Sequence, residues 1–182
     1  MAATAAPGTL ETVRHFVNSV ELESDADPLG PNDSLAQWCA QSGLCPDADA
    51  AALAELRRFR EALRGVLEAN AGDGQPADRW RALEPYAGRA GYMMYITAEG
   101  MPALRPQGSG AGAAIAAILA IVYDAIAQGT WSRLKACRKH SCRWAFYDQS
   151  KNGSGAWCSM RVCGNRAKAQ RRRAREKSHE NA

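Results

Sequence analysis

The sequence predicts a mainly α-helical domain with a small β-hairpin, followed by a small module with two cysteine knuckles, a second hairpin and a basic helix. Apolar residues recur at helical spacing through most of residues 1–131, and two Cys-x4-Cys pairs lie close together in residues 132–182. A chain of 182 residues can bury one sizeable core and still add such a module. We therefore place the domain boundary between residues 131 and 132.

Helices are predicted at five places in the first domain, over residues 10–20, 35–42, 47–70, 78–87 and 113–128. Thr9 and Asp47 are suitable N-terminal caps, and Gly43 is a suitable C-terminal stop. The acidic, turn-rich stretch 21–31 is predicted to be a loop. The last helix is apolar on almost every face, so it belongs at the centre of the core.

The short hairpin is predicted from residues 91–97 and 101–106, which combine β-branched and aromatic residues around a turn. We interpret Met93, Met94 and Met101 as core residues. The same methionines would line a site for a small-molecule effector, if the helical domain enclosed one against the hairpin.

Several polar residues and cysteines of the first domain receive structural interpretations. Asn18 is expected to be an exposed helix residue. Cys39 and Cys45 are expected to be core or surface thiols, because no second pair completes a tetrahedral site for them. A solvated, ion-paired helix face is predicted for the cationic cluster Arg57, Arg58, Arg60 and Arg64.

The net charge of +4 is divided unequally along the chain. Residues 132–182 contain 14 Lys and Arg against 3 Asp and Glu, a net charge of +11, which leaves −7 for the rest. Such asymmetry indicates that a polyanion would bind the C-terminal module and be repelled by the first domain. The longest apolar run, 111–127, is interrupted by Asp124, and the N-terminus has no secretory signal pattern. We therefore expect a soluble, cytoplasmic protein.

The four cysteines of the C-terminal module are Cys137, Cys142, Cys158 and Cys163. Two equally spaced pairs joined by fifteen residues are typical of a tetrahedral site for one structural zinc ion. Two disulfides or four buried thiols are the alternatives, and a reducing cytosol disfavours the disulfides. His140 lies between cationic and polar neighbours, so we expect a solvated residue and not a ligand.

This segment resembles the CGNR zinc finger. The resemblance is carried by the cysteines, by Trp144, Phe146 and Tyr147, by the Asp148-Gln-Ser150 motif and by the tetrapeptide Cys163-Gly-Asn-Arg166. In that family the finger usually follows a domain called ABATE, which is associated with stress-induced transcription regulators. The first domain is similar to ABATE in its order of elements and in the motif Phe16-Val-Asn18. One departure is the run Gly153-Ser-Gly-Ala156, where the family tends to have basic residues.

Within the finger we expect strands over residues 133–136 and 143–147 and a helix over 163–176 capped by Asn165. Trp144, Phe146 and Tyr147 are interpreted as its small core. A basic helix held at one end by a metal site suits the major groove of DNA. The candidate contacts to nucleic acid are Arg143, Lys151, Asn165, Arg166, Lys168, Arg171, Arg172, Arg173 and Arg175.

These observations predict a zinc-finger protein that binds nucleic acid, most simply a DNA-binding transcription regulator that responds to stress or to a ligand. Two alternatives remain. An RNA-binding protein would stack bases on the finger aromatics, and a protein-interaction module would use the same surface without nucleic acid. No catalytic motif accompanies the three histidines, so we do not expect an enzyme.

Overall fold

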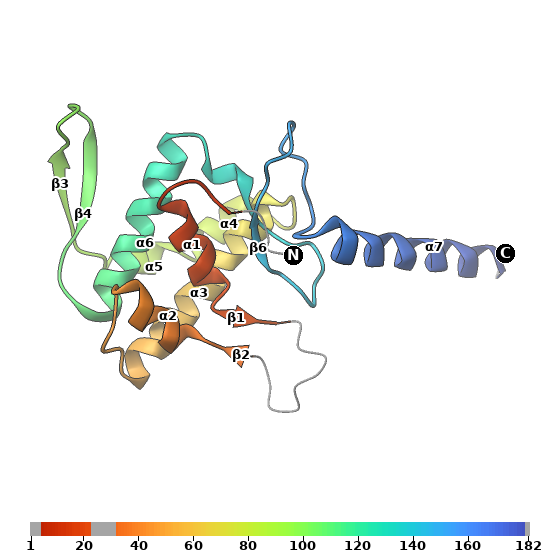
Figure 1. The fold of residues 1–182 in the computed structure, drawn as a ribbon, viewed down its shortest axis with the longest axis horizontal. Coiled ribbons are helices and arrows are strands. Elements are labelled where there is room, and N and C mark those ends of the chain that lie inside the picture. The colour runs from red at the N-terminus through yellow and green to blue at the C-terminus, as the bar shows by residue number, and fades with distance from the viewer. Residues whose placement is uncertain (1–4, 23–31, 181–182) are drawn as a thin grey trace.

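The computed structural model describes residues 5–22 and 32–180. Its helical body is centred on α6 (Gly110–Ala127), which packs against α1 (Leu10–Val17) and α3 (Ala50–Asn70). Figure 1 shows the β3–β4 hairpin on one side of this body and the finger, residues 132–180, on the other. The last helix, α7 (Asn165–Glu180), extends away from the body.

Most predicted helices form close to their expected bounds. Helix α2 spans Leu35–Ser42 and ends at Gly43, whose φ of 69° lies in the left-handed region that glycine tolerates. Helix α3 begins at Ala50 because the carboxylate of Asp49 caps it, accepting from the Ala52 backbone N–H at 2.8 Å. The cap is therefore two residues later than predicted.

The first helix is shorter than predicted, and the chain after it forms a small strand pair. Helix α1 ends at Val17, and Val20 lies in β1 (Val20–Glu21), which pairs antiparallel with β2 (Asn32–Asp33). Thr9 makes no side-chain cap bond. Most of the predicted loop, residues 23–31, lies outside the described residues.

The predicted helix over residues 78–87 is two short helices, α4 (Pro76–Arg81) and α5 (Glu84–Ala87). Pro85 explains the break, because a proline ring inside a continuous helix would clash with the carbonyl of residue 81 and would remove a hydrogen bond.

The core of the body is apolar and aromatic. Phe16 lies 4.9 Å from Trp38 and 5.7 Å from Phe59, measured between ring centroids. Cys39 and Cys45 are buried free thiols in this core, as predicted. By length and composition α6 could cross a membrane, but the same composition is expected of the central core helix that it forms here.

The predicted hairpin forms from β3 (Tyr92–Ile96) and β4 (Pro102–Pro106), paired antiparallel with Met94 opposite Leu104. The interpretation of its methionines as core was wrong. Met93, Met94 and Met101 are 47%, 70% and 62% exposed, because the hairpin projects from the body and contacts α6 mainly through β4.

The finger hairpin, β5 (Leu134–Ala136) and β6 (Ala145–Tyr147), packs against the body, β5 on α3 and β6 on α1. Leu134, Ala136 and Ala145 are buried in the same apolar cluster as the helices. Apolar packing therefore continues across residue 131. The domain boundary that we placed there stays a prediction.

Candidate metal centre and basic helix

The four cysteines come from three neighbouring pieces of the finger. Cys137 directly follows β5, Cys142 lies in the loop before β6, and Cys163 lies in a π-helical turn, η2 (Met160–Gly164), that leads into α7. Cys158 precedes that turn. Ser159 caps the turn, its Oγ accepting from the Val162 backbone N–H. The metal centre is thus joined directly to the start of α7.

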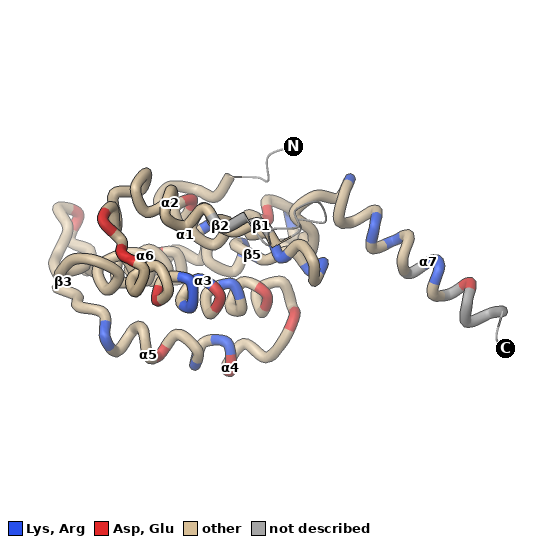
Figure 2. Tube along the Cα trace, turned by 90° about the horizontal axis from the view of Figure 1, so that it is seen from below, with Lys and Arg blue, Asp and Glu red and all other residues tan. Residues whose placement is uncertain are grey.

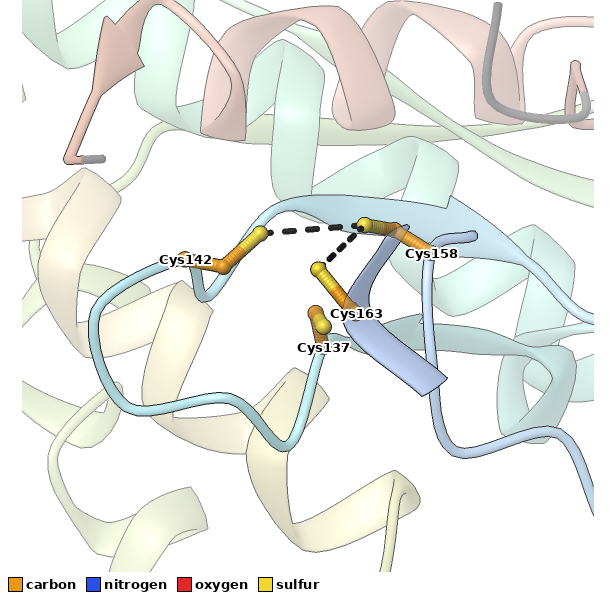
Figure 3. Close-up of side chains that lie close together, drawn as sticks. All are labelled: Cys137, Cys142, Cys158 and Cys163. Carbon is orange, nitrogen blue, oxygen red and sulfur yellow. Dashed lines mark hydrogen bonds between the residues drawn. The ribbon is translucent and has the colours of Figure 1, made fainter. Parts of the chain in front are cut away.

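All four sulfurs lie within 4.8 Å of one another and point toward a common centre (Figure 3). The Sγ atom of Cys158 is 3.7 Å from the Sγ atoms of Cys142 and Cys163. A zinc–sulfur bond of about 2.3 Å in a tetrahedron places sulfurs about 3.8 Å apart, whereas a disulfide bond is about 2.05 Å long. The arrangement therefore fits one structural Zn²⁺, and none of these cysteines is disulfide-bonded in the structure.

The four thiols perturb one another's pKa values because they lie so close together. Hydrogen bonds from the thiols of Cys142 and Cys158 lower the pKa of Cys137. The interaction with Cys137 raises the pKa of Cys142 and of Cys158. Without a cation the cluster therefore favours one thiolate over four, and a bound metal ion would supply the charge that lets all four ionise. His140 is exposed and lies outside the cluster, as predicted.

A buried ion pair supports the linker between the two cysteine pairs. Lys135 Nζ lies 2.8 Å from Asp148 Oδ2, and both side chains are buried. Asp148 also accepts from the backbone N–H groups of Ser150 and Gly155. A Cβ at position 155 would lie 2.6 Å from Asp148 Oδ1, so a larger residue here would force the hydrogen-bonded carboxylate to move. This close contact is a physical reason for a glycine here, in the stretch where the CGNR family tends to have basic residues.

Asn18 joins the body to the finger, which corrects our expectation of an exposed helix residue. Its side-chain amide donates to the Ala145 carbonyl at 2.9 Å and accepts from the Ala145 backbone N–H at 2.8 Å. The amide therefore satisfies both backbone groups of one residue in β6. The motif Phe16-Val-Asn18 contained the signal, but the distant partner could not be read from the sequence.

The cationic face of α3 was also predicted incorrectly in part. Arg57 and Arg58 are exposed, but Arg60 and Arg64 are buried. Arg64 donates to the carbonyls of Val17 and Arg143, and therefore bridges the end of α1 and the finger. A buried guanidinium can satisfy two carbonyls at once because its donors are arranged in a fixed fork.

Arg143, a candidate contact to nucleic acid, is instead directed at α3. Its Nε donates to the carboxylate of Glu68, and its backbone has a φ of 49°, a conformation that is uncommon outside glycine. The bond from Arg64 to its carbonyl helps to hold this conformation. Neither Glu68 nor Arg64 was singled out by the sequence as a partner of the finger.

The finger aromatics are largely covered, as predicted for a small core. Phe146 is buried, Trp144 is half-buried against the cysteines, and Tyr147 is half-buried against the core of the body. Part of the finger core is therefore supplied by the helical body.

The remaining candidate contacts lie on α7 or in the loop before it. Lys151 is exposed in the loop, and Arg166, Lys168, Arg172 and Arg173 are exposed on α7. Figure 2 shows basic positions distributed along this helix, and Arg171 and Arg175 belong to it as well. Asn165 is not the helix cap that we predicted, because its amide donates to the Arg161 carbonyl and the helical path already begins after Ser159.

A cavity of about 390 Å³ lies where α1 and α2 meet the finger. Its walls include Trp38 from the body and Trp144 from the finger, together with the polar residues His15, Gln37 and Gln41. A ligand in this cavity would contact both parts of the molecule.

Two family models match the chain, one after the other along the sequence. Residues 11–129 match the ABATE family, described as "Putative stress-induced transcription regulator", and residues 133–176 match the CGNR zinc finger. No curated protein matches the chain in sequence. The ABATE match covers more than half of the chain, and the cysteine geometry fits the finger that follows it. The chain therefore belongs to the ABATE family and bears a C-terminal CGNR zinc finger with a site for one structural Zn²⁺.

Proposed function

We propose that the protein is a DNA-binding transcription regulator in the cytoplasm, in which the zinc centre is structural and α7 contacts the phosphates and the groove. The observation that supports this most strongly is the direct connection between the metal centre and an exposed basic helix. Cys163 and the first residues of α7 share one helical path, so the metal would fix the base of that helix. A regulator of this kind has no catalytic role.

The proposed phosphate contacts are Lys151, Arg166, Lys168, Arg171, Arg172, Arg173 and Arg175, with Asn165 at the base of the helix. Lysine and arginine bind nucleic acid by neutralising phosphates and releasing counterions. An α-helix fits the major groove of B-form DNA. We leave Arg143 out of this set because Glu68 already pairs with its guanidinium.

Duplex DNA is favoured over single-stranded RNA because the finger aromatics are buried or half-buried, and Trp144 lines the cavity that the finger shares with α1 and α2. Stacking on a base requires an exposed ring face. Phe146 is buried, and Trp144 and Tyr147 pack against the cysteines and the body. An RNA-binding protein would have to release these rings, and a protein-interaction module would need an acidic partner.

The test is the salt dependence of binding to a duplex obtained by selection from a random pool. Changing Lys168, Arg172 and Arg173 to Ala should lower the slope of log K against log salt by about 2.7, at about 0.9 for each phosphate that is no longer neutralised. The matched control is Arg57→Ala with Arg58→Ala, which removes exposed cations from α3. A slope that is unchanged in the α7 variant, or equally reduced in the control, contradicts the proposal.

The cavity between α1, α2 and Trp144 is the proposed site of a small-molecule effector. Two tryptophans and several amide or imidazole groups in its lining suit a planar, polar ligand. Such a ligand should raise the melting temperature and quench tryptophan fluorescence, and Gln37→Ala should weaken both effects. A panel of heteroaromatic compounds that changes neither signal would remove the effector from the proposal.

A further inference from the structure

The β3–β4 hairpin has two edges, and only the β4 edge is protected. Hydrogen bonds from Thr97 N–H to the Met101 carbonyl and from Gln107 N–H to the Gly91 carbonyl show that odd-numbered residues of both strands face each other across the hairpin. Backbone polar groups alternate in direction along a strand. Even-numbered residues therefore direct their N–H and C=O groups outward.

On the outer edge of β4 the outward positions are Pro102, Leu104 and Pro106. Two of these three residues have no N–H group, so this edge cannot accept another strand efficiently. Helix α6 also lies against β4. The two prolines and the contact with α6 therefore protect the outer edge of β4 from pairing with another strand.

The outer edge of β3 has neither form of protection. Its outward positions are Tyr92, Met94 and Ile96, each of which has both a donor and an acceptor. The strand Tyr92–Ile96 contains no proline and no charged residue. In the part of the chain that the structure describes, β3 pairs only with β4, and Figure 1 shows β3 on the side of the hairpin away from α6. An uncharged open edge of this kind is a template for pairing with another strand.

The apolar side chains on this hairpin also lack cover. Tyr92, Met94 and Ile96 share one face with Pro102, Leu104 and Pro106, because paired residues in an antiparallel sheet point to the same side. Met94 and Ile96 are 70% and 64% exposed. An isolated two-stranded hairpin is only marginally stable in water, and additional strands stabilise it.

We propose that β3 pairs antiparallel with β3 of a second copy of this chain, which joins two hairpins into a four-stranded sheet in the order β4, β3, β3, β4. The edge is self-complementary about Met94. A two-fold axis at this residue places Met94 opposite the partner's Met94 and places Tyr92 and Ile96 opposite the partner's Ile96 and Tyr92. All outward donors then meet outward acceptors, and the exposed apolar side chains lie side by side across the axis.

A second copy fits this edge better than an unrelated peptide, because three properties of the strand favour pairing with an identical strand related by a two-fold axis. The hydrogen-bonding groups match about the central residue, the side chains brought together are all apolar, and no charge is repeated across the axis. The inference does not depend on nucleic-acid binding. The finger lies on the other side of the body, so both copies of α7 remain accessible in the dimer.

The test is sedimentation equilibrium of the zinc-loaded full chain without nucleic acid, for the wild type and two charge variants. Met94→Lys places two like charges opposite each other at the axis, so we expect loss of the dimer. Met101→Lys adds the same charge at a residue of similar exposure outside the paired strand, so it should remain dimeric. Far-UV circular dichroism should be the same for all three chains.

Amide hydrogen exchange of the wild type gives a second readout that needs no variant. The amides of Tyr92, Met94 and Ile96 should exchange slowly at concentrations where the chain is dimeric and rapidly on dilution. A monomeric wild type, a Met94→Lys chain that stays dimeric, a Met101→Lys chain that becomes monomeric, or rapid exchange of these three amides in the dimer would each overturn the inference.

Discussion

The β5–β6 hairpin and α7 both lead away from the metal centre, but only the hairpin is built into the helical body. Leu134, Ala136 and Ala145 lie in the main apolar core, and Asn18 and Arg64 bond directly to the backbone around β6. Helix α7 extends from the opposite side of the centre with a basic, solvent-exposed surface (Figure 2). The cysteines thus join a region that is packed into the core and a helix whose described basic side chains are exposed.

The largest expected effect is loss of the metal. Cys158→Ser with Cys163→Ser removes two of four ligands, and structural zinc sites contribute about 10–16 kcal/mol of apparent binding free energy at neutral pH. We expect η2 and the start of α7 to lose their structure, while the β5–β6 hairpin stays packed against the body. Zinc content and backbone NMR shifts would check both expectations.

A matched comparison is Cys39→Ser with Cys45→Ser, which changes two cysteines outside the cluster. This variant should retain one zinc ion per chain. If the Cys158 and Cys163 variant also binds one zinc ion and keeps the native shifts of α7, the centre does not hold that helix.

The next largest effect should come from the buried ion pair. Asp148→Asn leaves Lys135 buried without its charge partner, and breaking a buried pair in this way costs about 3–5 kcal/mol of stability. Urea denaturation of the zinc-loaded chain would measure this loss. Gln149→Asn, at the exposed neighbouring position, should have little effect.

The same pair predicts a direction of pH dependence. Burial opposes ionisation of Asp148, but hydrogen bonds from Lys135, Ser150 and Gly155 outweigh it and lower its pKa below the ordinary value. A lowered pKa in the folded state contributes stability that is complete above the unfolded value of about 3.9 and is lost as the pH falls below it. The stability difference between wild type and Asp148→Asn should therefore shrink below about pH 4. A difference that stays constant or grows on acidification would contradict the assignment.

A smaller effect is expected from the two hydrogen bonds by which Asn18 joins the body to the finger. Asn18→Ala leaves the N–H and C=O of Ala145 without their partner, and unsatisfied buried groups of this kind cost about 1–3 kcal/mol. Asn18→Asp keeps the acceptor for the Ala145 N–H, but near neutral pH its ionised carboxylate places a second oxygen against the Ala145 carbonyl, so it should be at least as destabilised as Asn18→Ala. Equal stability of Asn18→Ala and wild type would show that β6 is held to the body by apolar packing alone.

The smallest effect on stability belongs to the basic helix. Lys168, Arg172 and Arg173 are exposed, and the ion pair of Arg172 with Glu176, at 3.4 Å, is open to solvent. Changing the three cations to Ala should alter the free energy of unfolding by less than about 0.5 kcal/mol. Denaturation curves would measure this. A large loss of stability would indicate that α7 packs on the body.

Features determined by local sequence could be predicted well. The cysteine spacing identified the metal ligands, and Gly43 marked the end of α2, because both depend on residues that are near one another in the chain. The roles of Asn18, Arg64 and Glu68 could not be predicted, because each depends on a partner more than 45 residues away. The exposure of Met94 was missed for the same reason, since an apolar strand resembles a core strand until its neighbours are known.

The most direct test compares the affinity of the full chain for its selected duplex and for a scrambled duplex, with zinc and with a chelator. We predict that the zinc-loaded chain prefers the selected duplex, and that the chelated chain binds both duplexes weakly and equally, because a basic segment without a fixed base retains only sequence-independent attraction to phosphate. A preference that is unchanged by removing zinc, or no duplex binding in either state, would contradict the proposal that the metal centre positions α7 on DNA.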